Sequence, residues 1–118
     1  MQINGIEFDF DFAEADDLER FETAYAVLSK ETEAKTGESN AQTLRRQCAA
    51  TKAFFDAVLG QGSYDKIVDK PQNIRSNTEA IYNFADAYAA ALEEMDALAQ
   101  KRRARYEKYT PGKRRGRK

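Results

Sequence analysis

Hydrophobic and acidic residues alternate at the start of the chain, in the stretch IEFDFDF over residues 6–12. A period of two predicts a half-buried strand with its aromatic side facing inward. The preceding pair Asn4-Gly5 is a strong hairpin turn signal, with Gln2-Ile3 as a short first arm. Two short strands are only marginally stable alone in water. We therefore expect this hairpin to lie on helices or to join the edge of a partner's sheet.

The rest of the chain has the three-to-four-residue spacing of amphipathic helices. Residues 13–35 predict one helix and residues 41–60 a second, with Gly60 as its C-terminal stop. A short turn of helix is expected over residues 64–69. The longest helical pattern covers residues 77–100 and continues toward Tyr106.

Capping residues are expected at the start of each later helix. Ser39 or Asn40 is placed to cap the second helix, and Ser63 the short one. For the long helix we expect Asn77 or Thr78 to be the cap, because Pro71 and the polar residues after it read as the end of the short helix.

The long helix has a sustained repeat close to 3.5 residues, which is typical of a coiled coil. Such a helix packs either against two others or against a copy of itself. The repeat is formed by Ile81, Ala85, Tyr88, Leu92, Met95 and Ala99.

Leu, Ile, Val and Phe total only 21 of 118 residues, and all of them lie within residues 1–100. Alanine, the best helix former, is abundant and lets helices approach closely. The expected fold is therefore mainly α: a small bundle of three to four helices with a short N-terminal β-hairpin. We expect a single acidic domain over residues 1–106 and a disordered basic tail over residues 107–118.

The net charge of −1 conceals a strong asymmetry. Residues 1–100 carry 9 Lys+Arg and 19 Asp+Glu, a net of −10, whereas residues 101–118 carry 10 Lys+Arg and one acid, a net of +9. The chain is thus an acidic body with a basic end.

The residue types that support common enzymatic chemistry are scarce. There is no His, so the commonest zinc ligand and the usual general base near neutral pH are missing. The single cysteine, Cys48, lies on an apolar helix face and reads as a small buried hydrophobe. No apolar run approaches the roughly 18 residues of a membrane span, and no signal peptide is evident. We expect a non-enzymatic cytoplasmic protein without a cofactor, metal or membrane partner.

The acidic N-terminal run has several interpretations. Its carboxylates could bind a hard cation, act as general acid and base, or mimic nucleic-acid phosphates and inhibit a host defence nuclease. The plainest reading is a solvated strand face followed by acids matched to a helix dipole. The candidate partner-binding acids are Asp9, Asp11, Asp16 and Asp17.

Phe54 and Phe55 are adjacent on a predicted helix, so their rings diverge by about 100°. Either this helix is buried on two sides, or one ring lies on an exposed patch that binds a protein partner. Both residues are therefore candidate partner-binding residues.

The basic end offers three kinds of contact. Its cations can neutralise phosphates of a nucleic acid, dock an acidic protein, or fold back on the acidic body. The candidate contact residues are Lys101, Arg102, Arg103, Arg105, Lys113, Arg114, Arg115 and Arg117.

Three stretches together resemble the tail assembly chaperones of phages and prophages of Gram-positive bacteria. They are the opening QINGIEFDFDF at residues 2–12 running into Asp16-Asp17, Cys48 followed by FFDAVLGQG at residues 54–62, and the ending YTPGKRR at residues 109–115. The resemblance implies a protein that coats the tape measure protein in the host cytoplasm and helps to recruit tail tube subunits. It also implies that the protein leaves before the virion is complete, and the opposite charges of its two ends permit self-association.

Overall fold

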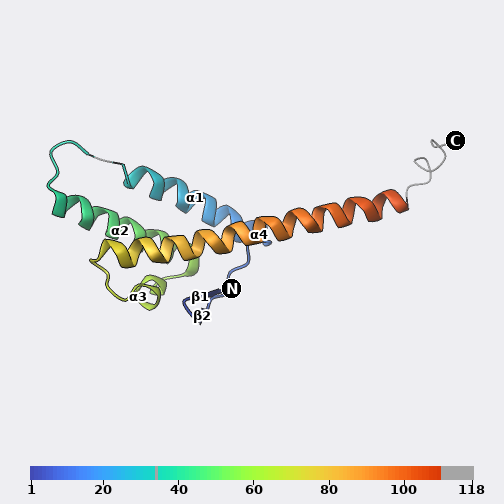
Figure 1. The fold of residues 1–118 in the computed structure, drawn as a ribbon, viewed down its shortest axis with the longest axis horizontal. Helices are drawn as coiled ribbons and strands as arrows, with labels where there is room; N and C mark the ends of the chain where they lie inside the picture. The colour runs from blue at the N-terminus through green and yellow to red at the C-terminus, as the bar shows by residue number, and fades with distance from the viewer. Residues whose placement is uncertain (34, 110–118) are drawn as a thin grey trace.

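The computed structural model describes residues 1–33 and 35–109, and it confirms a mainly helical fold with a short N-terminal hairpin. The helices are α1 (Ala15–Glu31), α2 (Asn40–Leu59), the short α3 (Ser63–Ile67) and the long α4 (Ile74–Lys108). Helices α1 and α4 each pack on α2, and the C-terminal half of α4 projects alone beyond the bundle (Figure 1). The molecule therefore measures 71 × 33 × 20 Å. None of the described helices is apolar over a stretch long enough to cross a bilayer.

The hairpin consists of β1 (Gln2–Ile3) and β2 (Ile6–Glu7), paired antiparallel. Asn4 and Gly5 both have positive φ, 52° and 80°, as the tight hairpin turn requires. The Asn4 side chain donates to the carbonyl of Ile67 at 2.9 Å and accepts from the Asn83 amide at 3.0 Å. The hairpin therefore lies on α3 and α4 of its own chain.

The expected strand over residues 6–12 is wrong beyond Glu7. The pairing ends after the hydrogen bond from Phe8 N to Met1 O at 2.8 Å. Phe10 N instead donates to Phe8 O at 2.9 Å in a tight turn. The alternation itself survives, because the phenylalanines of residues 8–12 are buried and the acids between them are exposed.

The core is a cluster of aromatic rings contributed by the N-terminal segment and the three long helices. Neighbouring centroids lie 4.7 to 6.1 Å apart, mostly edge to face, which is the favoured geometry for aromatic pairs. Phe84 of α4 is central because it contacts rings from the N-terminal segment, from α1 and from α2. The cluster comprises Phe10, Phe12, Phe21, Phe54, Phe55, Phe84 and Tyr88.

The start of α4 differs from expectation. Asn73 is the cap, since its side-chain oxygen accepts from Arg75 N at 2.9 Å and from Ser76 N at 3.1 Å. Asn77, expected as a cap, lies one turn inside the helix and is 1% exposed. Its Oδ1 accepts from the Tyr64 hydroxyl at 2.7 Å, which joins α3 to α4.

The other helix limits agree more closely. Ser39 caps α2 through a reciprocal pair of hydrogen bonds with Gln42, and Gly60 ends α2 at φ 110°. For α3 the expected cap is wrong, because Gly62 occupies that position in the left-handed region and Ser63 is already helical. Helix α1 covers less of residues 13–35 than expected.

At the C-terminal end, α4 continues past Tyr106 to Lys108. The basic residues 101–108 are thus helical. Residues 110–118, which make up most of the expected disordered tail, lie outside the described residues.

Candidate functional site

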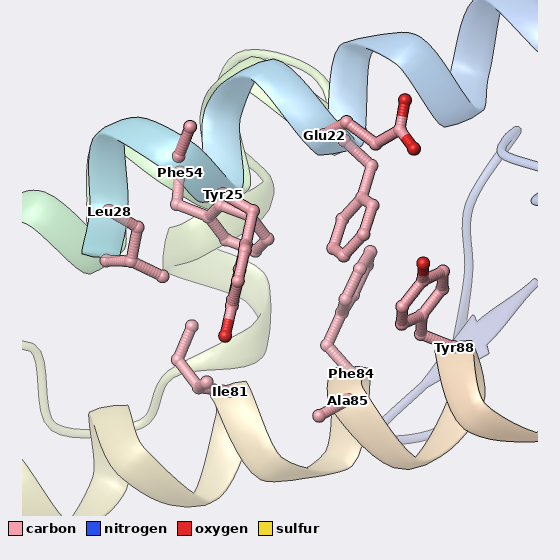
Figure 2. A pocket seen from close by; sticks show the side chains of 10 residues that line it. Glu22, Tyr25, Leu28, Phe54, Ile81, Phe84, Ala85 and Tyr88 are labelled. Carbon is pink, nitrogen blue, oxygen red and sulfur yellow. The ribbon is translucent and has the colours of Figure 1, made fainter. Parts of the chain in front are cut away.

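An apolar groove of about 300 Å³, which we call the aromatic groove, runs between α1 and α4 (Figure 2). Phe54 of α2 reaches its floor from behind, and Tyr25, 51% exposed, stands at its mouth. The one charged residue in its lining is Glu22. The walls are formed mainly by Phe21, Tyr25 and Leu28 of α1 and by Ile81, Phe84, Ala85 and Tyr88 of α4.

The groove exists because α1 and α4 both pack on α2 and approach each other less closely. On α1 the apolar residues recur at i, i+4 and i+7, and on α4 the small side chain of Ala85 interrupts the larger ones. The three long helices α1, α2 and α4 thus leave open the position that the remaining long helix takes in a four-helix bundle. The arrangement suits helix-in-groove recognition.

A second groove, of about 560 Å³, follows the other side of α1, against α2. Its more accessible apolar lining consists of the exposed Val27 and the small side chains of Ala24, Ala50, Ala53 and Ala57, with the buried Leu28 and Phe54 beneath them. Charged residues at its rim include Asp16, Glu19 and Arg20. Its small side chains form a flat apolar strip. We call this surface the alanine-lined groove.

The distal part of α4 is a third apolar surface. We call residues 92–108 the arm. Leu92 is 44% exposed and Leu98 52% exposed, and the α4 residues that pack against the hydrophobic core end at Ala91. Met95 is half-buried and lines a hollow together with Met1 and Phe12 of the N-terminal segment. Leu92 and Ala99 continue the stripe that begins with Ile81 and Ala85 in the groove wall, because all four follow one helical repeat.

Phe54 and Phe55 do not form an exposed patch. They are 4% and 0% exposed, with their centroids 5.2 Å apart. Of the two sequence-based alternatives, the helix buried on two sides is therefore the correct one. Phe54 still contributes to the groove floor, whereas Phe55 belongs to the core.

The four candidate acids split into two kinds. Asp17 accepts from the backbone N–H of Asp11 at 3.0 Å and from the Arg20 guanidinium at 3.0 Å. Asp11 accepts from Ala13 N at 2.9 Å. These two carboxylates stabilise the turn that leads into α1. Asp9 and Asp16 are exposed, and Asp16 lies at the rim of the alanine-lined groove.

The basic candidates lie on the arm as far as the structure describes them. Of the candidate residues, four are exposed cations of the helix: Lys101, Arg102, Arg103 and Arg105. A hydrogen bond to the Tyr106 hydroxyl at 3.4 Å raises the pKa of Arg102 further above its ordinary range. Lys113, Arg114, Arg115 and Arg117 lie outside the described residues.

Other candidate chemistry is buried or structural. Burial raises the pKa of the Cys48 thiol, so the thiolate is disfavoured. Between residues 1 and 109, apart from residue 34, no group of three or more Cys, Asp or Glu side chains is arranged to hold a metal ion.

A protein-family model matches residues 4–118, almost the whole chain. The chain belongs to the family of unknown function DUF6673. No curated protein matches it, and no solved structure does so either.

The aromatic groove is the feature that sequence reasoning missed. Both of its walls carry stripes that are visible in the sequence, around Phe21 on α1 and around Ile81 on α4. Each stripe reads as core, because spacing shows which residues share a face and not whether a neighbour covers that face. The uncovered part became visible only from the packing of α1 and α4 on α2.

Proposed function

We propose that this protein is a non-enzymatic, tail assembly chaperone-like protein that holds helices of a phage tape measure or tail tube protein. The proposal starts from the resemblance of residues 2–12, 54–62 and 109–115 to such chaperones. It places the work in the bacterial host cytoplasm and the protein outside the mature virion.

The observation that carries the proposal is the alanine-lined groove between α1 and α2. Another helix can approach closely where the wall is made of Ala50, Ala53 and Ala57. Because these side chains present small apolar area and no deep pocket, each contact is weak and tolerant of the client's sequence. A carrier that must release a long client during assembly needs binding of this kind.

The charged residues at the rim of the alanine-lined groove orient the client helix more than they add to the binding free energy. Asp16 and Glu19 border the apolar strip and are exposed, so a client helix with basic residues on its flanks would be steered toward them. Two of the candidate acids, Asp9 and Asp16, do not stabilise the turn that leads into α1. Of these two, only Asp16 lies at the alanine-lined groove, so only Asp16 has a role in this proposal.

The test is affinity capture from phage-producing cells. Tagged protein is expected to co-purify the tape measure protein, and Ala53→Arg, which fills the strip, is expected to reduce the yield about tenfold. Ala41→Arg, at an exposed position of α2 outside the groove, serves as the matched control. Failure of the unaltered protein to capture any tail protein, or its presence in finished particles, would refute the proposal.

Basic residues on the arm favour nucleic-acid binding as a second candidate function. Four cations lie within residues 101–105 on an exposed helix. Such binding would weaken steeply with salt and disappear on truncation after Gln100.

A further inference from the structure

Residues 92–105 of the arm do not pack against the hydrophobic core. These residues extend about 21 Å at the rise of an α-helix, and this part of α4 projects beyond the bundle (Figure 1). Isolated helices of this length are marginal in water, because most helical stability in proteins comes from burying an apolar face. A helix that exposes Leu92 and Leu98 there calls for a covering partner.

The same chain also has an apolar surface, the aromatic groove, over which none of the described helices is packed. The aromatic groove between α1 and α4 can take side chains of a helix lying over it, and its α4 wall is the beginning of the stripe that the arm continues. The stripe runs from Ile81 to Ala99 without a charged residue, through roughly three heptads. A partner helix lying along this stripe would meet the groove and the arm as one continuous apolar surface.

We propose that the partner is a second copy of this chain, with its α4 antiparallel to the first. In this arrangement the part of each arm that begins at Ala99 lies over the aromatic groove of the other copy, and Leu92 lies at the centre of the pair. With Leu92 of one copy opposite Met95 of the second, the heptad steps place Tyr88 opposite Ala99 and Ala85 opposite Arg102. The contact is two-fold symmetric, so it closes at two copies.

Charge supports a second copy and the antiparallel direction. The described end of the arm, residues 101–109, carries five cations and one acid. Glu22 in the groove wall, with Glu79 and Asp86 on the adjoining part of α4, makes the receiving end acidic. An antiparallel pair brings unlike charges together at both ends, whereas a parallel pair would set the basic ends side by side. A partner of unrelated sequence has no such built-in match.

Light scattering coupled to size-exclusion chromatography on the purified full chain tests the pairing. The unaltered protein should have the mass of a dimer. Leu92→Glu should raise the dimer dissociation constant at least about a hundredfold, since each dimer loses two buried leucines. Ala97→Glu adds the same charge at an exposed position of the same arm, on the face opposite the stripe, so this control should remain dimeric. A monomer at roughly 1 mM, or equal loss in both variants, would overturn the proposal.

Disulfide trapping tests the direction. In the double variant Ala85→Cys, Arg102→Cys the two new thiols lie about 25 Å apart along one helix, so they can bond only between copies. Rapid cross-linking of the double variant, with little in either single variant, is expected for the antiparallel pair. Efficient cross-linking of the single variants would indicate a parallel pair and contradict the proposed register. These measurements use the protein alone, so they do not depend on the client proposed above.

Discussion

Removing one hydroxyl group, by Tyr64→Phe, should destabilise the bundle more than most single-atom changes. The Tyr64 side chain is 1% exposed, and its oxygen lies 2.7 Å from Asn77 Oδ1 and 2.8 Å from Pro71 O. A hydroxyl has one hydrogen to donate. Pro71 O already receives the Asn77 amide at 3.1 Å, so the hydroxyl hydrogen is best assigned to Asn77 Oδ1.

The size of the effect follows from this assignment. In Tyr64→Phe, the Asn77 oxygen stays buried without a donor, which costs about 1–3 kcal/mol. For a chain of this size a loss of about 2 kcal/mol lowers the melting temperature by roughly 8 °C. In Asn77→Leu, by contrast, the Tyr64 hydroxyl can turn to Pro71 O, so that variant loses hydrogen bonds but leaves no orphaned hydroxyl.

A double-mutant cycle measured by urea unfolding separates these terms. Adding Tyr64→Phe to Asn77→Leu should cost much less than adding it to the unaltered protein, which gives a coupling of about 1 kcal/mol or more. If Tyr64→Phe alone changed the free energy of unfolding by less than about 0.5 kcal/mol, the assigned hydrogen bond would not be supporting the junction between α3 and α4.

Two further predictions concern titratable groups. Arg46 binds both carboxylate oxygens of Glu38, at 2.8 and 2.9 Å, and this lowers the pKa of Glu38; the pair therefore stabilises the fold above the ordinary carboxylate range and loses that effect as the pH falls through the lowered pKa. Urea unfolding of Arg46→Gln should accordingly show a deficit at pH 7 that narrows at about pH 2.5, with the exposed neighbour variant Arg45→Gln as the control; a deficit independent of pH would contradict this. Cys48, buried and with a raised pKa, should react with a thiol reagent only after denaturant is added, and rapid labelling of the folded protein would show that the thiol is accessible.

Local signals along the chain determined most of the secondary structure. The Asn4-Gly5 turn, the Ser39 cap and the Gly60 stop each act within a few residues, and helical spacing marked the long helices. Such features depend on short-range sterics and hydrogen bonds, which the neighbouring residues settle among themselves.

The errors came where a distant contact outweighed a local preference. Asn77 resembles a cap, yet it lies inside α4 because Tyr64, thirteen residues away, satisfies its side chain. The segment after Glu7 alternates like a strand, but Phe10 N donates to Phe8 O within the segment, so the segment turns instead of pairing.

The candidate site depended on tertiary structure most of all. The sequence left open whether Phe54 and Phe55 both lie in the core or whether one of them lies on an exposed patch. Packing on both sides of α2 buries both residues. The spacing from Ile81 to Ala99 predicted one apolar helix face. Which part of that face is covered depends on how α1 and α4 lie on α2. Periodicity records which side chains point the same way, whereas only the arrangement of whole helices in space determines whether anything lies opposite them.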